Sequence, residues 1–230
     1  MRDVVIVAHG SPSDPVPQET ALTAIAERIA QVAPNGRLRS ATLAADGALA
    51  RAVKGLKHPL IYPWFMTNGW FVSTNLPRRL AKAGLDSFDI LPSLGLEPAL
   101  PDCAKAALRA WITGPKPTLV LAAHGSPSDP RPRAATLAFA AELEASDLFA
   151  AVRTGFVDEA PSIEDAARAA PDAVVLPFFA ARAGHVLMDM PDALAAAGHH
   201  GPVLDPIGTW DATVELAGHS ISDAIRNLAA

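Results

Sequence analysis

The sequence has a single cysteine and no long apolar run. Its one cysteine, Cys103, excludes an internal disulfide and any multi-cysteine metal site within the 230 residues. No apolar stretch approaches the roughly 20 residues of a transmembrane helix, and the first residues indicate a strand rather than a signal peptide. The chain also lacks a basic excess, because its net charge of −5 disfavours nucleic acid and anionic membranes as partners. We therefore expect a cytoplasmic protein that binds neither nucleic acid nor a membrane.

What the sequence does contain is a repeat. The string HGSPSDP occurs at 9–15 and again at 124–130, each time directly after an apolar run. Further matches follow in the same order, since 62–77 parallels 176–191 and 91–95 parallels 204–208. Units of this length far exceed the roughly 20–50 residues of solenoid repeats. We therefore predict two domain-sized halves, 1–114 and 115–230, joined near residues 114–117.

Short apolar runs alternate with alanine-rich helical stretches in both halves. Such alternation predicts parallel sheets with helices on both faces. The predicted fold class is α/β, with two tandem doubly wound parallel-sheet halves and a cleft between them. Strands are expected at 3–8, 38–43, 60–64 and 88–91, and at 118–123, 152–157, 173–178 and 203–204. The clearest helices are expected at 19–32, 134–145 and 211–228.

Three polar residues of the second half follow three different predicted strands: His124, Glu159 and His185. Because ligands bind beyond the carboxyl ends of parallel strands, we expect these side chains to share one edge. Two imidazoles and a carboxylate suit a divalent first-row metal such as cobalt, iron, nickel or zinc. Without a metal, the same groups suit proton abstraction near neutral pH. Taken alone, each histidine is also compatible with a capping or core role.

The first half keeps only the first of these residues. His9 corresponds to His124, but an alanine (Ala45) and a phenylalanine (Phe71) replace the other two. Structural roles would persist in both halves, so a loss from one half predicts a single asymmetric active site in the other. We expect His9 to be auxiliary. The loop that contains Trp70 and Phe71 is expected either to line a wall for a flat apolar ligand or to pack between the halves.

Other polar residues have plainer interpretations. The four serines of the repeated string are expected to shape a turn and cap the following helix; they are Ser11, Ser13, Ser126 and Ser128. Three arginines near the predicted site are either solvated or paired with substrate carboxylates; they are Arg131, Arg133 and Arg182. Three further histidines are expected to face solvent; they are His199, His200 and His219.

One combination of motifs matches a known pattern. An apolar strand ends in A-H-G-S at 123–126, a glutamate segment follows at 156–162, and P-F-F, G-H-V and D-x-P occur in order within 177–191. The combination resembles the class II tetrapyrrole chelatases, and most closely the long, two-half sirohydrochlorin cobaltochelatases and ferrochelatases. The resemblance covers nearly the whole chain.

The resemblance implies insertion of a divalent metal into sirohydrochlorin, in cobalamin or siroheme biosynthesis. The family's two histidines and glutamate would fall on His124, His185 and Glu159. The metal (cobalt, iron or nickel) would be a substrate, and no organic cofactor would be needed. Because sirohydrochlorin is polyanionic, the three arginines would become clamps for its carboxylates.

The same residues leave two alternative functions to consider, and the repeat also predicts the oligomeric state. The main alternative is a metal- or tetrapyrrole-binding relative of the chelatases without turnover. A histidine phosphatase is disfavoured, because Ala8 and Ala123 stand where that chemistry would place an arginine. Two similar halves in one chain supply the pseudo-twofold cleft that a half-length chain would make by dimerising, so we expect a monomer.

Overall fold

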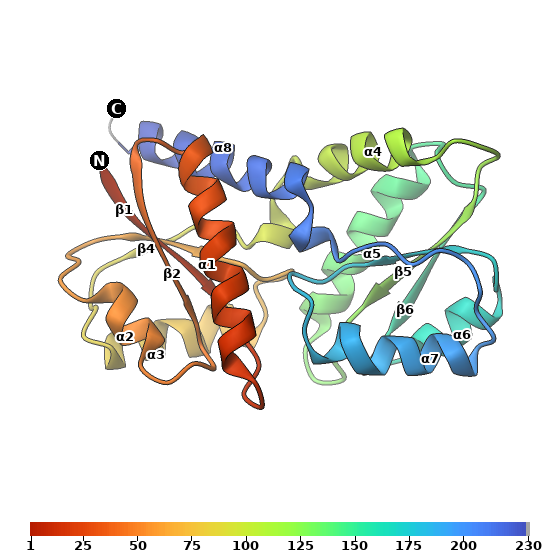
Figure 1. Cartoon of the computed structure of the whole chain (residues 1–230), viewed down its shortest axis with the longest axis horizontal. Helices are drawn as coiled ribbons and strands as arrows, with labels where there is room; N and C mark the ends of the chain where they lie inside the picture. The colour runs from red at the N-terminus through yellow and green to blue at the C-terminus, as the bar shows by residue number, and fades with distance from the viewer. Residues whose placement is uncertain (229–230) are drawn as a thin grey trace. The chain divides into compact units, whose positions relative to one another are not determined.

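The computed structural model describes residues 1–228. It is an α/β protein with two compact units, each built on a parallel sheet (Figure 1). The first unit comprises Met1–Glu97 together with the chain from Val214 onward, and the second comprises Pro98–Thr213. Among the described residues, no helix combines the length and apolar character that a membrane crossing requires. The predicted α/β class, with two parallel sheets flanked by helices, is confirmed.

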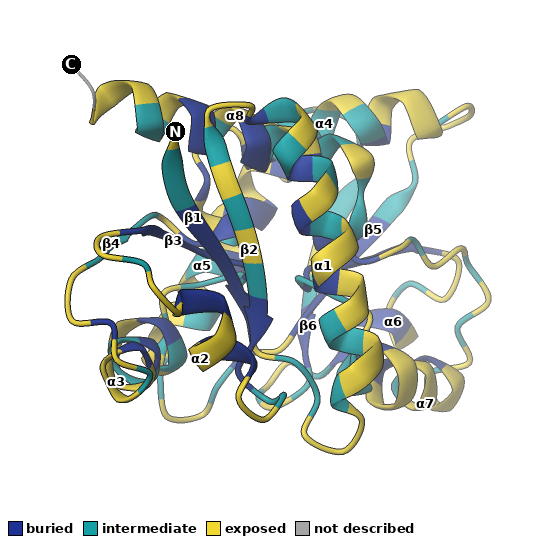
Figure 2. Ribbon diagram, turned by 60° about the vertical axis from the view of Figure 1, so that its left-hand side comes forward, coloured by how far each residue is buried: buried dark blue, intermediate teal, exposed yellow. Residues whose placement is uncertain are grey.

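The sheet of the first unit has the strand order β2-β1-β3-β4, with parallel neighbours throughout. Its strands are β1 (Arg2–Ala8), β2 (Gly36–Thr42), β3 (Leu60–Pro63) and β4 (Asp89–Ile90). Its helices are α1 (Pro15–Val32), α2 (Ala48–Val53), α3 (Leu76–Lys82) and most of α8 (Asp211–Asn227), with a π-helical turn at Phe71–Asn75 and a 3-10 turn at Leu94–Leu96. Both α1 and α2 contact β1, which is buried along its apolar run, whereas α1 alternates buried and exposed positions (Figure 2).

The sheet of the second unit has the order β6-β5-β7, again with parallel neighbours. Its strands are β5 (Thr118–Ala123), β6 (Ala151–Phe156) and β7 (Val174–Pro177). Its helices are α4 (Leu100–Trp111), α5 (Pro130–Glu144), α6 (Ile163–Arg168) and α7 (Met190–Ala196), with a π-helical turn at His185–Asp189 and a 3-10 turn at Ile207–Thr209. The apolar runs that predicted the two central strands are therefore β1 and β5.

The strand expected at 203–204 is reduced to an isolated bridge between Val203 and Val175. The first unit shows why. There the ladder begins with the backbone N–H of Asp89, which donates to the carbonyl of Pro59. The corresponding residue of the second unit is Pro202, which has no N–H to donate. The second unit thus has three strands where four were predicted.

The helices that follow the repeated string begin earlier than the helical periodicity predicts. They start at Pro15 and Pro130, rather than at 19 and 134, because proline is well suited to the first turn of a helix. The cap of α5 is Asp129, whose side chain accepts a hydrogen bond from the backbone N–H of Arg131. The Ser126 hydroxyl instead accepts from the N–H of Asp129. In this copy the serine shapes the turn, as predicted, but an aspartate caps the helix.

The two compact units differ from the predicted halves 1–114 and 115–230 in one helix each. α4, from the first half of the sequence, belongs to the second unit, and most of α8, from the second half, belongs to the first unit. α4 packs against α5 in the second unit, and α8 packs in the first, where Gly218 lies against Val32 of α1. A buried polar cluster adds to this contact, since the hydroxyls of Tyr62 and Ser220 both donate to the Glu97 carboxylate over 2.8 Å. Burial and the neighbouring Glu97 charge raise the pKa of the Tyr62 hydroxyl. Each unit is therefore completed by the last helix of the other sequence half.

Candidate functional site

Two histidines of the second unit meet at the carboxyl edge of its sheet. His124 follows β5 directly, and His185 opens the π-helical turn after β7. Their ring centroids are 4.4 Å apart and the ring planes are nearly perpendicular, at 77°. Gly125, with φ of 74°, allows the chain to turn immediately after His124. The structure thus brings together two of the three residues that the sequence predicted, and we call them the histidine pair.

Each ring of the histidine pair has an aspartate beside its Nδ1 atom. Asp158 Oδ2 lies 3.2 Å from Nδ1 of His124, which is also 3.0 Å from the Gly125 carbonyl oxygen. Asp189 Oδ2 lies 2.6 Å from Nδ1 of His185. All four side chains are between 43% and 49% exposed, so the pair is open to a ligand. Neither aspartate was among the site residues predicted from the sequence, although Asp158 adjoins Glu159 and Asp189 belongs to the D-x-P motif.

Glu159 does not join the histidine pair. Its Oε1 accepts a hydrogen bond from the backbone N–H of Ser126 over 3.0 Å, and its Oε2 lies 3.3 Å from an Arg133 guanidinium nitrogen. That arginine also donates to the Ala160 carbonyl over 2.7 Å. A Cβ atom built on Gly125 would lie 2.7 Å from Oε1, so the carboxylate packs directly against the loop that carries the histidine. Among the described residues, no three metal-ligating side chains are placed to hold an ion together.

The three predicted clamp arginines all have carboxylate partners within the protein. Arg131 makes several hydrogen bonds to Asp129, and these raise the pKa of its guanidinium. Arg133 contacts Glu159, as described above. Arg182 forms an ion pair with Asp205. A substrate carboxylate would therefore have to replace an existing partner of these arginines.

The first unit repeats the ring geometry with different chemistry. His9 meets Phe71 at a centroid distance of 4.4 Å and an angle of 63°, close to the values of the histidine pair. Its Nδ1 lies 3.0 Å from the Gly10 carbonyl oxygen. Trp70 packs edge-on against Phe71 and is 50% exposed. This edge therefore presents aromatic surface and one imidazole.

The first unit also places its carboxylate differently. Ala44 and Ala45 occupy the positions that correspond to Asp158 and Glu159, as the backbone hydrogen bonds from Ala44 and Asp158 to the two strand-end histidines indicate. A carboxylate is supplied instead by Glu19 of α1, whose Oε2 accepts from the Thr42 N–H and hydroxyl over 2.7 and 2.6 Å. This carboxylate is thus committed to the end of β2.

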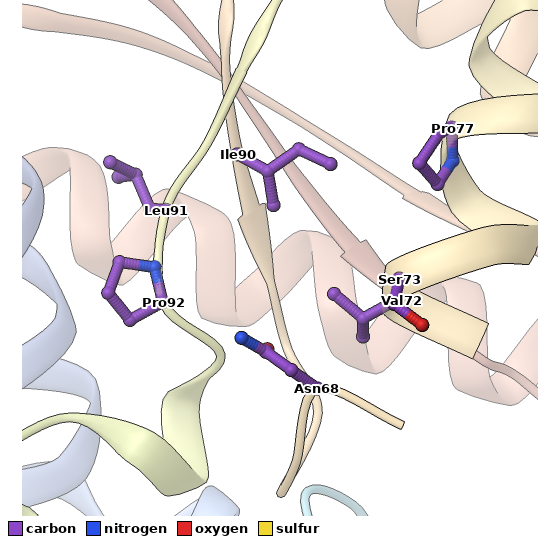
Figure 3. Close-up of a pocket in the computed structure, with 7 residues that line it drawn as sticks. All are labelled: Asn68, Val72, Ser73, Pro77, Ile90, Leu91 and Pro92. Carbon is purple, nitrogen blue, oxygen red and sulfur yellow. The ribbon is translucent and has the colours of Figure 1, made fainter. Parts of the chain in front are cut away.

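A cavity of about 360 Å³ opens beside this edge of the first unit (Figure 3). Its walls are mainly apolar, and Asn68 lies between Pro92 on one side and the π-helical turn on the other; the lining residues are Asn68, Val72, Ser73, Pro77, Ile90, Leu91 and Pro92. Asn68 Oδ1 accepts a hydrogen bond from Ser93 over 2.5 Å. The corresponding positions of the second unit carry the Arg182 ion pair with Asp205. One unit thus has an apolar pocket where the other has paired charges.

Comparisons with known proteins agree with this geometry. The CbiX family model matches residues 118–228. Among solved structures, the chain is similar to CbiX, described as the terminal enzyme for biosynthesis of siroheme in denitrifying bacteria, with 43% identity over 97% of this chain and 99% of that chain and a TM-score of 0.86. Comparison with curated proteins gives no match.

More distant structures share the fold. DR2241 from Deinococcus radiodurans, a multi-domain protein with structural similarity to chelatases, is 21% identical over 100% of this chain and 60% of its own, with a TM-score of 0.71. SirB from Bacillus subtilis with Fe³⁺ is 15% identical over 100% of this chain and 96% of its own, with a TM-score of 0.75. These two show the fold alone. The match to CbiX is different, because it combines 43% identity with nearly full coverage of both chains, and it therefore establishes family membership as well as fold. The chain belongs to the CbiX family of class II chelatases.

Proposed function

We propose that this protein is a sirohydrochlorin metallochelatase, which inserts a divalent metal ion into the tetrapyrrole. The observation that carries the proposal is the histidine pair, which lies at the ligand-binding edge of the second unit with its rings 4.4 Å apart. The family membership and the 43% identity to an enzyme of siroheme biosynthesis give the substrate class.

The reaction needs a metal ligand and a proton acceptor at one place. Metal insertion replaces two pyrrole N–H protons of the macrocycle by bonds to the metal, and both protons must leave. A neutral imidazole can bind a first-row metal ion or accept a proton near neutral pH. We propose that His124 and His185 share these tasks: one holds the incoming metal, while the other receives the two pyrrole protons in turn and passes each to the solvent that reaches its exposed ring.

Glu159 and His9 take secondary places in this proposal. Glu159 is the proposed third metal ligand or proton relay, and it reaches the histidine pair only by exchanging its contact with Arg133. His9 remains a proposed auxiliary group, because its ring neighbour is Phe71 rather than a second imidazole. Arg131 and Arg182, with side chains 49% and 55% exposed, are proposed to trade their aspartate partners for substrate carboxylates.

The relative's role in siroheme biosynthesis favours ferrous iron as the metal, with cobalt for cobalamin biosynthesis as the second choice. Imidazole nitrogen suits iron, cobalt and nickel alike, so geometry and metal supply would decide between them. The monomeric state, the cytoplasmic location and the absence of nucleic-acid and membrane partners stay predictions from the sequence.

The direct test is visible absorbance spectroscopy of sirohydrochlorin with the protein and Fe²⁺, Co²⁺ or Ni²⁺ in turn. The wild-type protein should accelerate metallation over many turnovers. His185→Ala should lower the rate by about 10²–10⁴-fold, the usual contribution of a positioned acid–base group. His219→Ala, on the exposed side of α8, is the control and should leave the rate unchanged.

Two outcomes would contradict the proposal. A normal rate in His185→Ala would remove the histidine pair from the reaction. Metallation that stops after one equivalent in the wild-type protein would instead favour the alternative, a metal- or tetrapyrrole-binding relative without turnover.

A further inference from the structure

Among the described residues, the polar partners of the histidine pair contact one nitrogen of each ring, Nδ1, and all of them are hydrogen-bond acceptors. Nδ1 of His124 faces the Gly125 carbonyl oxygen at 3.0 Å and Asp158 Oδ2 at 3.2 Å. Nδ1 of His185 faces Asp189 Oδ2 at 2.6 Å. Carbonyl and carboxylate oxygens accept hydrogen bonds and do not donate them, so each Nδ1 must carry the hydrogen. The lone pair of each neutral ring is therefore on Nε2.

The first unit lacks this arrangement. The residues that correspond to Asp158 and Asp189 are Ala44 and Asn75. Within residues 1–228, the acceptor beside Nδ1 of His9 is a backbone carbonyl rather than a carboxylate. The carboxylate partners thus occur at the strand-end site that has two imidazoles and are missing from the strand-end site that has one. This is the distribution expected of groups that serve the imidazoles rather than the fold.

We infer that Asp158 and Asp189 are positioning residues, which hold His124 and His185 as Nδ1–H tautomers and aim both Nε2 lone pairs at the incoming metal or pyrrole proton. The inference rests on the proposed function of the histidine pair. Its physical basis is that a carboxylate on the far nitrogen fixes the tautomer and the ring orientation of a histidine ligand, and makes the ligand more basic. Asp189 is the stronger holder because its contact is shorter, and it lies on the same π-helical turn as its histidine.

The first measurement reads the tautomers directly. Long-range ¹H–¹⁵N correlation spectra distinguish Nδ1–H from Nε2–H rings by the two nitrogen shifts. Both rings of the pair should be Nδ1–H in the wild-type protein at a pH where they are neutral. Asp189→Leu should release His185 into a tautomer mixture while His124 keeps its state. An Nε2–H tautomer of His185 in the wild-type protein would overturn the inference without any activity measurement.

The second measurement follows the chemistry. Asp189→Leu should lower kcat for metallation about 10–100-fold, with little change in KM for sirohydrochlorin, and should weaken Co²⁺ binding to the protein alone by a similar factor. Asp189→Asn copies the first unit, keeps an acceptor oxygen and should recover part of the loss. Asp158→Ala, which also copies the first unit, should have a smaller effect because the Gly125 carbonyl still holds the ring. Asp192→Leu, exposed in the first turn of α7, is the matched control and should behave as wild type.

The results separate this inference from the proposed function. If His185→Ala abolishes metallation but Asp189→Leu and Asp158→Ala leave kcat and Co²⁺ binding intact, the positioning role fails and the histidine pair stands. If His185→Ala itself has no effect, the proposed function fails. Equal losses in Asp189→Leu and Asp192→Leu, with a lowered unfolding midpoint in both, would show a merely structural role and would also overturn the inference.

Discussion

The carboxyl edges of the two units share a backbone frame and differ in chemistry. Each has a histidine after its central strand, stacked edge-on at 4.4 Å against a ring from a π-helical turn. In the first unit the second ring is Phe71, with Trp70 beside it. In the second unit it is His185, and two aspartates stand behind the pair. The same backbone arrangement thus presents aromatic side chains at the carboxyl edge of the first unit's sheet and polar side chains at that of the second.

This difference shows which parts of the frame are structural and which are chemical. The positive-φ glycine after each strand and the ring-on-ring contact occur in both units, so they belong to the fold. The second imidazole, both aspartates and the loop glutamate occur in one unit only. Substitutions at corresponding positions can therefore separate the two kinds of contribution.

The largest difference is expected between the two strand-end histidines. His124→Ala removes one member of the histidine pair and should lower metallation about 10²–10⁴-fold. His9→Ala, the matched variant, removes an imidazole whose ring neighbour is Phe71 rather than a second imidazole, and should lower metallation less than about tenfold. Initial rates from the absorbance assay compare the two. If His9→Ala abolishes metallation while His124→Ala is tolerated, the active site lies in the other unit.

The strand-end glycines should separate stability from activity. Gly10 and Gly125 have φ of 76° and 74°, and a Cβ at either would lie 2.7 Å from its nearest neighbour. Alanine at either position should therefore lower the free energy of unfolding by about 1–3 kcal/mol, which urea titration measures. That neighbour is Thr42 for Gly10 but the Glu159 carboxylate for Gly125.

Only Gly125→Ala should therefore also disturb the histidine pair and reduce metallation of the folded protein. Equal activities in the two glycine variants, under conditions in which both are folded, would mean that the Glu159 contact does not bear on the site.

The smallest effect concerns pH. His199 holds the place that Leu85 holds in the first unit. The backbone N–H of each donates over 3.0 Å to the carbonyl of a leucine in the preceding helix, which is Leu194 for His199 and Leu80 for Leu85. Leu85 is buried, whereas His199 is partly buried, and this partial burial lowers the pKa of His199 below its ordinary 6.5. Below pH 6.5 the unfolded chain binds a proton that the folded ring resists. The contribution of neutral His199 to the free energy of unfolding is therefore fully present above pH 6.5. It is lost as the pH falls from 6.5 through the lowered pKa of the folded state.

His199→Leu, which copies the first unit, should remove this loss. Urea midpoints at about pH 7.5 and about pH 5.5 should converge in the variant relative to wild type. His219→Gln, at an exposed position of α8, is the control and should keep the wild-type dependence. A wild-type pH dependence in His199→Leu would contradict the burial effect.

Much of the fold could be predicted because the apolar strands are unambiguous. The strand predicted at 118–123 has the bounds of β5, and the strand-end rule placed His124 and His185 at one edge. The errors have local causes. The helices predicted from residues 19 and 134 begin earlier, at Pro15 and Pro130, and Pro202 shortened a predicted strand.

The parts of the site that were missed depend on contacts across the fold. Glu159 was predicted beside the histidines, but its rotamer is decided by Arg133 and the Ser126 N–H, which lie far from it in sequence. The role of Asp189 depends on a π-helical turn that helical periodicity does not reveal. The partial burial of His199 is not apparent from its polar turn, and the sequence signal for it is the alignment of His199 with Leu85 of the first half.

The position of α8 affects the order in which the protein can be completed during synthesis. Residues 98–213 form a continuous unit, whereas the first unit needs residues from Val214 onward. Until those residues leave the ribosome, the Glu97 carboxylate lacks its Ser220 donor and the end of α1 at Val32 lacks its neighbour Gly218. The part of the chain made first is therefore finished last. Closing its core joins residues far apart in the sequence, such as Val32 and Gly218, and contacts of this kind slow folding.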